Sequence, residues 1–153
     1  MIDFKRLKDL REDHDLTQQE MANILKVSRS SYSLWELGIN IIPLSKLCMQ
    51  ADYFDVSIDY LLGLTNKKNS KSIIKGLELK ILGDNLREIR KKNNLSQDDM
   101  ANILGVTQAC VTRYEKGLIE ISTSNLYKYS RMFKISLSCL CGKNKDIPVK
   151  QNS

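Results

Sequence analysis

Cysteine and histidine are the residue types in this chain best suited to metal binding or catalysis, but their spacing argues against both. No C-x-x-C pair exists among the four cysteines, which are Cys48, Cys110, Cys139 and Cys141. The single histidine lies in the charged segment Asp13-His14-Asp15, with no glycine-rich phosphate loop or nucleophile motif around it. Zinc sites require several such ligands at close spacing. We therefore expect reduced, apolar cysteines, an exposed His14, no metal or cofactor, and no enzymatic activity.

Composition and charge indicate a soluble protein with a polyanionic partner. The chain has 153 residues, of which 42% are hydrophobic and 27% charged, and its formal net charge is +6. A basic surplus favours nucleic acid or an anionic membrane. No apolar run approaches the ~18 residues that span a bilayer. The first six residues reach charge at once, unlike a signal peptide, so we expect a cytoplasmic protein that does not contact a membrane.

A long internal repeat determines the domain organisation. Residues 4–63 align without a gap with residues 83–142, at an offset of 79, and 19 of the 60 aligned pairs are identical. Met21-Ala22-Asn23-Ile24-Leu25, for example, recurs as Met100-Ala101-Asn102-Ile103-Leu104. A repeat of this length indicates two copies of one small domain. We assign residues 1–66 to the first domain, 67–82 to a partly helical linker, 83–142 to the second domain and 143–153 to a flexible tail.

Each copy reads as five short helices without strands. Apolar residues recur at helical spacing, and period-two alternation is absent. A capping box at Thr17 and Glu20 is expected to start the second helix, and Pro43 is expected to be the first residue of the fourth. Other boundaries are indicated by Ser28, Gly38, Ser57 and Gly63, and in the second copy by Ser96, Thr107, Gly117, Ser122, Ser136 and Gly142. In the linker, Ile74, Leu77, Ile81 and Leu82 would share one helical face.

The segment Thr17–Gly38 and its repeat Ser96–Gly117 carry the most specific signal. Each contains [ST]-Q, a small alanine, a valine at the turn, a polar helix and a final aromatic-Glu-x-Gly. This pattern resembles the helix-turn-helix of the phage-repressor and Cro-type family, also called the xenobiotic-response-element family. The resemblance covers about 120 of the 153 residues. It implies an all-α fold of two tandem lambda-repressor-like DNA-binding domains, in which the third helix of each enters the major groove.

The resemblance and helical geometry together nominate the DNA-binding residues. A third helix that turns Tyr32 and Trp35 inward turns its opposite face outward. The family's reading positions match that outward face, together with a glutamine at the start of the second helix, where the helix dipole favours phosphate. The nominated residues are Gln18, Arg29, Ser30, Ser33 and Leu34 in the first copy and Gln97, Gln108, Ala109, Thr112, Arg113 and Lys116 in the second.

The second copy has more side chains suited to DNA contacts than the first. Arg113 suits guanine, Gln108 suits adenine, the Ala109 methyl suits thymine, and Lys116 suits a phosphate. Residues 1–66 carry a net charge of −3, residues 67–82 carry +4 and residues 83–153 carry +5. Because attraction to phosphate dominates non-specific affinity, the second copy should bind DNA more strongly. Arg87, Arg90, Lys91, Lys92 and the linker lysines either extend its footprint or form a solvated face.

Two features of the first copy depart from the family pattern. Lys26 stands where the family usually has glycine, as the second copy does at Gly105, so we expect the first turn to differ slightly. The run Leu34, Leu37, Ile39, Ile41 and Ile42 is apolar, and Ile42 has the apolar counterpart Ile121. Leu34 and Leu37 turned outward would form a sticky patch, which motivates a homodimer or a protein partner at this face.

The leading hypothesis is a bacterial or phage-like, sequence-specific transcriptional regulator that is repressor-like and reads double-stranded DNA with both third helices. The alternative is a protein-interaction module, such as an antitoxin or adaptor, that uses the first domain to bind a partner. DNA binding that weakens with salt separates the two hypotheses.

Overall fold

The computed structural model describes residues 2–68 and 75–143, and these form ten helices and no strand. The chain divides into two compact units, Met1–Ser70 and Lys71–Ser153, which we call the first and second unit. The predicted all-α fold with two five-helix copies is confirmed. Within the described residues, no helix is long and apolar enough to cross a membrane.

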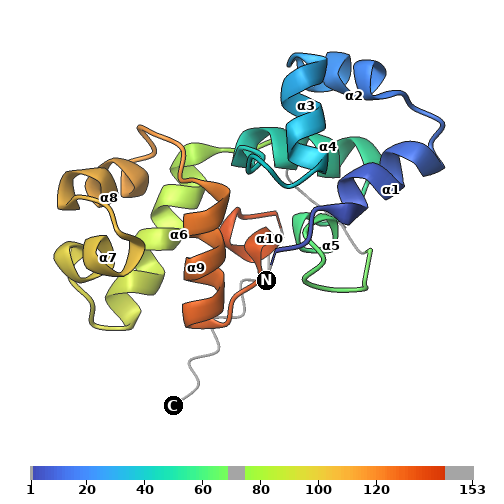
Figure 1. Cartoon of the computed structure of the whole chain (residues 1–153). Coiled ribbons are helices and arrows are strands. Elements are labelled where there is room, and N and C mark those ends of the chain that lie inside the picture. The colour runs from blue at the N-terminus through green and yellow to red at the C-terminus, as the bar shows by residue number, and fades with distance from the viewer. Residues whose placement is uncertain (1, 69–74, 144–153) are drawn as a thin grey trace. The chain divides into compact units, whose positions relative to one another are not determined.

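The first unit contains α1 (Lys5–Asp13), α2 (Gln18–Leu25), α3 (Arg29–Glu36), α4 (Leu44–Phe54) and α5 (Ile58–Leu61). Helix α3 packs against α2 and α1 (Figure 1). The core consists of fully buried side chains from all five helices and the loop before α4, including Leu7, Met21, Leu25, Tyr32, Ile42, Leu47 and Leu61. Ile42 is therefore a core residue, as its repeat partner Ile121 indicated, and Ile121 is 1% exposed.

The second unit repeats this arrangement with α6 (Leu79–Lys92), α7 (Gln97–Leu104), α8 (Gln108–Glu115), α9 (Thr123–Phe133) and α10 (Leu137–Leu140). Four of these helices begin and end 79 residues after their counterparts. Helix α8 packs against α6 and α7 (Figure 1). The helical register of the two copies is therefore the same.

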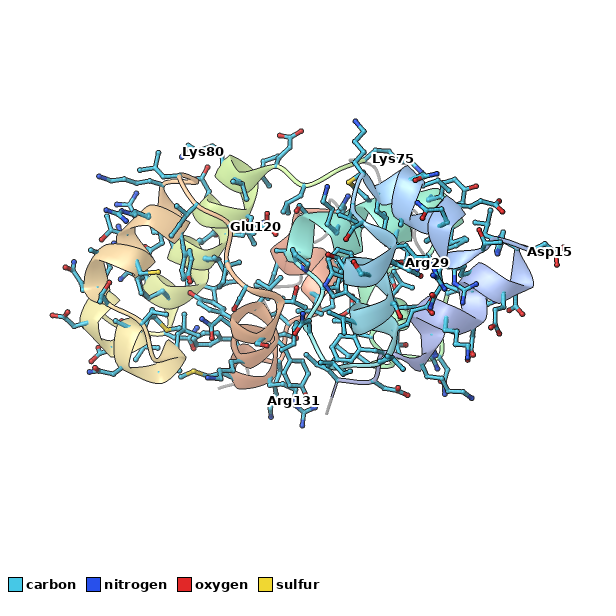
Figure 2. All side chains as sticks on the ribbon, turned by 45° about the horizontal axis from the view of Figure 1, so that its top comes forward. Asp15, Arg29, Lys75, Lys80, Glu120 and Arg131 are labelled. Carbon is cyan, nitrogen blue, oxygen red and sulfur yellow. The ribbon has the colours of Figure 1, made fainter. Side chains whose placement is uncertain are left out.

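Helix α6 is the exception, because it begins one turn earlier than α1 does. The first five residues of α6 pass the end of α8 so closely that glycine is needed at both contact points. A Cβ on Gly83 would lie 2.5 Å from the carbonyl oxygen of Tyr114, and a Cβ on Gly117 would lie 2.9 Å from Cα of Lys80. Figure 2 labels Lys80 at this end of α6. The first turn of α6 thus supports α8, whereas Phe4 takes the place of Gly83 in the first unit.

Several boundaries differ in detail from those predicted. Pro43 is the N-cap of α4 rather than its first residue. Thr17 caps α2 through the backbone N–H of Glu20, but the reciprocal capping box forms only in the second unit, between Ser96 and Asp99. The shorter Asp99 carboxylate accepts from the backbone N–H of Ser96 at 2.8 Å, whereas the Glu20 carboxylate accepts from the Thr17 hydroxyl instead.

The linker and tail are described only in part. Leu77 lies outside any helix, because α6 starts at Leu79, and Ile74 falls outside the described residues. Of the four linker residues predicted to share a helical face, Ile81 and Leu82 are therefore the ones that the structure places in a helix, α6. Lys143 was assigned to the tail by sequence but is buried, and its Nζ donates to the carbonyl of Gly76 at 2.5 Å. The predicted flexibility of residues 144–153 falls outside the described residues.

Candidate nucleic-acid interface

A buried ion pair fixes the third helix of each unit. In the first unit Arg11 Nε donates to Glu36 Oε1 at 2.6 Å, and Arg11 Nη1 donates to the carbonyl of Leu16 at 2.7 Å. The side chains of Arg11 and Glu36 are 8% and 3% exposed. Because a bidentate guanidinium pair holds both partners in one geometry, the end of α3 is tied to α1 and to the loop before α2.

The second unit repeats this ion pair 79 residues later. Arg90 Nη2 donates to Glu115 Oε1 at 2.8 Å, and Arg90 Nη1 donates to the carbonyl of Leu95 at 2.8 Å. The sequence pattern alone did not indicate a positioning role for these arginines and glutamates, and it left Arg90 as a possible extension of the DNA footprint. The available signal was that both members of the pair are identical in the two copies. Because it is buried, Arg90 is a structural residue and does not extend the footprint.

Hydroxyl groups cap the N-termini of α3 and α8, the third helix of each unit, which we call the reading helices. Ser28 Oγ accepts from the backbone N–H of Ser31 at 3.1 Å, and Thr107 Oγ1 accepts from the N–H of Cys110 at 3.2 Å. Capping satisfies donors that the first helical turn would otherwise leave unpaired. Helices α3 and α8 therefore begin at equivalent positions of the repeat, and equivalent residues lie on the outer face of each helix.

The nominated residues of these helices lie on their outer faces, which we call the reading faces. The exposed members are Arg29 and Ser30 on α3 and Gln108, Ala109, Arg113 and Lys116 on or at the end of α8. The half-buried members are Ser33, Leu34 and Thr112. In each unit the opposite side of the helix is buried, through Tyr32 and Trp35 or through Val111 and Tyr114. A short helix with one buried and one polar face has the dimensions that the major groove accepts.

The two half-buried glutamines that begin α2 and α7 make different contacts. Gln18 Nε2 donates to Glu36 Oε2 at 2.9 Å, so this amide is bound to the buried ion pair. Gln97 Oε1 accepts from Gln108 Nε2 at 2.8 Å and from Thr112 Oγ1 at 2.7 Å. The second unit therefore joins three nominated residues in one hydrogen-bonded group, and sequence spacing did not reveal this difference.

The Glu36 carboxyl group is electrostatically distinctive. Burial raises its pKa, but hydrogen bonds from Arg11 and Gln18 outweigh burial, and the pKa lies below its ordinary value of 4.5. The carboxylate is therefore ionised at neutral pH and holds both donors. It follows that Gln18 braces this ion pair in the first unit.

The turns between the helices are alike in both units, which corrects our expectation for the first copy. Lys26 has φ 59° and ψ 45°, and Gly105 has φ 69° and ψ 35°, so both adopt the left-handed conformation. The Schellman-type bond from Val27 N–H to the carbonyl of Ala22 is 2.9 Å long. The geometry of the turn is therefore preserved, and lysine accommodates it at a cost in backbone strain.

The apolar surface of the first unit lies beyond the reading face. Leu34 is half-buried, so the expected face of Leu34 and Leu37 is only partly exposed. Leu37, Ile39 and Ile41 are instead 68%, 66% and 48% exposed. They continue from the end of α3 into the following loop, next to a shallow hollow of about 700 Å³ whose lining includes Leu37 and Phe4.

The candidate catalytic and metal-binding residues do not assemble into a site. His14 is exposed, its Nδ1 lies 2.8 Å from the carbonyl oxygen of Leu10, and its ring packs against Phe54 at 4.6 Å. Asp15 points into solvent at the edge of the first unit (Figure 2). Within the described residues, no group of three or more histidine, cysteine, aspartate or glutamate side chains could hold a metal ion.

Comparison with known proteins agrees with this geometry. A helix-turn-helix family model matches residues 7–61 and 86–138. The uncharacterized HTH-type transcriptional regulator YobD of Bacillus subtilis is 39% identical over 74 residues, which are 48% of this chain and 66% of the relative. The HTH-type regulator YqaE of the same organism is 40% identical over 65 residues, covering 42% of this chain and 56% of the relative.

A third relative comes from a different functional class. Antitoxin PezA of Streptococcus pneumoniae is 29% identical over 65 residues, covering 42% of this chain and 41% of the relative. The matches thus span less than two thirds of the length of these relatives. No solved structure matches the chain significantly. Since the family model matches each unit separately and together spans more than half of the chain, this protein belongs to the Cro/C1-type helix-turn-helix family, with two tandem copies.

Proposed function

We propose that this chain is a repressor-like transcriptional regulator that binds double-stranded DNA sequence-specifically in the cytoplasm and catalyses no reaction. The observation that carries the proposal is the hydrogen-bonded group that joins Gln97, at the start of α7, to Gln108 and Thr112 on the outer face of α8. Each Gln amide nitrogen has two hydrogens, so Gln108 can donate one to Gln97 and still offer its oxygen and second hydrogen to adenine. The relatives named as transcriptional regulators support the same conclusion.

The second unit supplies most of the affinity in this proposal. Arg113 and Lys116 are exposed on and next to its reading face, and residues 83–153 carry a net charge of +5. The first unit, at −3 over residues 1–66, has one cation on its reading face, Arg29. Since phosphate attraction provides nearly all non-specific binding, the difference in charge favours the second unit.

Fluorescence anisotropy of duplex DNA over a range of salt concentrations tests the proposal. Affinity should fall steeply as salt increases, and Lys116→Ala should reduce the salt slope by about 1 if Lys116 contacts a phosphate. Arg113→Ala should weaken binding to the preferred sequence by about 10- to 100-fold. Arg131→Ala removes the same charge from α9, outside the reading face (Figure 2), and should cost much less. A DNA affinity that does not change with salt concentration would refute the proposal, as would equal losses of affinity in Arg113→Ala and Arg131→Ala.

A second candidate function is protein binding by the first unit, either in a homodimer or with another partner. The exposed side chains of Leu37, Ile39 and Ile41 favour it, as does the similarity to an antitoxin. Leu37→Ser with Ile39→Ser should reduce the oligomer mass in analytical ultracentrifugation and leave DNA affinity unchanged. Leu118→Ser is the matched control, because Leu118 is 67% exposed at the position equivalent to Ile39. A loss of DNA affinity without a change in mass would assign this surface to DNA instead.

A further inference from the structure

Helices α3 and α8 have the same local geometry, but their reading faces carry different residues. Helices α3 and α8 have eight residues each, hydroxyl N-caps at equivalent positions and the same buried ion pair at their last residue. Equivalent positions of the repeat therefore lie on the outer face of the helix within each unit. The outward positions within these helices nevertheless carry different residues in the two units, and the pairs are Arg29 and Gln108, Ser30 and Ala109, Ser33 and Thr112, and Leu34 and Arg113.

The arginine of the reading face occupies a different position along the helix in each unit. Arg29 is the first residue of α3, whereas Arg113 is the sixth residue of α8. Five residues at 1.5 Å each separate the two positions by about 7.5 Å along the helix axis, or about two base-pair steps of 3.4 Å. An arginine that pairs with guanine would therefore select guanine at different places in the two contact sites.

The remaining positions differ in hydrogen-bonding capacity. At the position of Arg113, α3 has Leu34, which offers a base only an apolar contact. At the position of Gln108, α3 has Arg29, which donates but cannot accept, so it cannot pair with adenine as glutamine does. The bracing also differs, because Gln18 is bound to Glu36 whereas Gln97 is bound to Gln108 and Thr112.

We infer that one chain reads a non-palindromic DNA element made of two unlike blocks. The block read by α8 contains guanine opposite Arg113 and adenine opposite Gln108, and the block read by α3 contains guanine opposite Arg29 and no selected adenine. This inference rests on the proposed function. Two identical headpieces read two identical half-sites, whereas this chain carries two different headpieces in a fixed order. The DNA element consequently has a direction.

Selection of bound fragments from a random duplex library tests the inference on the full chain. The wild type should enrich two dissimilar blocks. Gln108→Ala with Arg113→Ala should remove base preference only from the block read by α8. Arg29→Ala should remove it only from the block read by α3. All three residues are exposed, and unchanged circular dichroism and Trp35 fluorescence should show that the variants remain folded.

The possible outcomes separate this inference from the proposed function. A palindrome, two identical blocks or a single block would overturn the inference while leaving a sequence-specific DNA binder. Loss of preference in both blocks from substitutions on one helix would overturn it as well. Binding without enrichment and without salt dependence would overturn the proposed function, and the inference with it.

Discussion

The left-handed residue of each helix-turn-helix offers a matched pair of substitutions. Lys26 and Gly105 occupy the same position of the repeat, with φ of 59° and 69°. Lys26→Gly should stabilise the first unit, and Gly105→Lys should destabilise the second. A Cβ on Gly105 would meet no atom within 4 Å, so the second substitution introduces backbone strain without a steric clash.

The expected magnitude follows from two opposing terms. A residue with a Cβ loses about 1–2 kcal/mol in the left-handed conformation. Glycine loses about 0.5–1 kcal/mol through its greater freedom in the unfolded chain. The net change in the free energy of unfolding is therefore about 1 kcal/mol, with opposite signs in the two variants. For a unit of this size, whose urea m-value is about 1 kcal/mol/M, the midpoint should move by about 1 M.

The assay can distinguish the two units because the chain has one tryptophan. Trp35 is 7% exposed in the first unit, so its fluorescence reports the unfolding of that unit. Far-ultraviolet circular dichroism reports both units. Lys26→Gly should raise the fluorescence midpoint in urea, whereas Gly105→Lys should lower the circular dichroism transition of the second unit and leave the fluorescence midpoint unchanged.

Lys26→Ala is the control for charge, because it removes the lysine side chain but keeps a Cβ in the left-handed conformation. Its fluorescence midpoint should stay near that of the wild type. An equal rise in Lys26→Ala and Lys26→Gly would show that lysine charge, and not strain, destabilises the turn. A fall in Lys26→Gly would refute the strain argument altogether.

Three further predictions concern the supports of the reading helices. Glu115→Gln should destabilise the second unit by about 3 kcal/mol or more, measured by circular dichroism in urea, because it leaves the Arg90 guanidinium buried without its counter-charge. Gly83→Ala should destabilise the same unit by about 1–3 kcal/mol, since the new methyl group would approach backbone oxygens of α8. Because the folded-state pKa of Glu36 is lowered, its contribution to stability is present above its ordinary pKa of 4.5 and is lost as pH falls through the lower folded value. The midpoint reported by Trp35 fluorescence should therefore decline on acidification below about pH 4.5.

Each of these predictions has a control on the same unit. Glu88→Gln removes an exposed carboxylate 2.9 Å from Lys92 and should cost less than about 0.5 kcal/mol. Gly105→Ala adds a methyl group where no atom lies within 4 Å, so its loss should come from backbone strain alone. Gln18→Ala removes one donor from the Glu36 carboxylate and should move the acid transition to higher pH. A transition unaffected by Gln18→Ala would show that this hydrogen bond does not hold the carboxylate ionised.

The sequence by itself determined the repeat, the helix class and the outer faces of the reading helices. These properties depend on local spacing, since apolar residues three and four apart define a buried stripe and a hydroxyl before it defines a helix start. The buried Tyr32 and Trp35 and the capping Ser28 are placed as that reasoning predicted. The family resemblance added the nominated residues, because the outward face alone does not say which side chains meet a base.

Only the tertiary structure decided how these residues are braced. Arg11 and Glu36 are 25 residues apart, and spacing along a single helix carries no information about such a pair. The direction of each glutamine amide was likewise decided by its neighbours, because Gln18 meets the Glu36 carboxylate and Gln97 meets the α8 side chains. The same residue at the same repeat position therefore has different contacts, since the atoms that surround it come from other helices and differ between the two units.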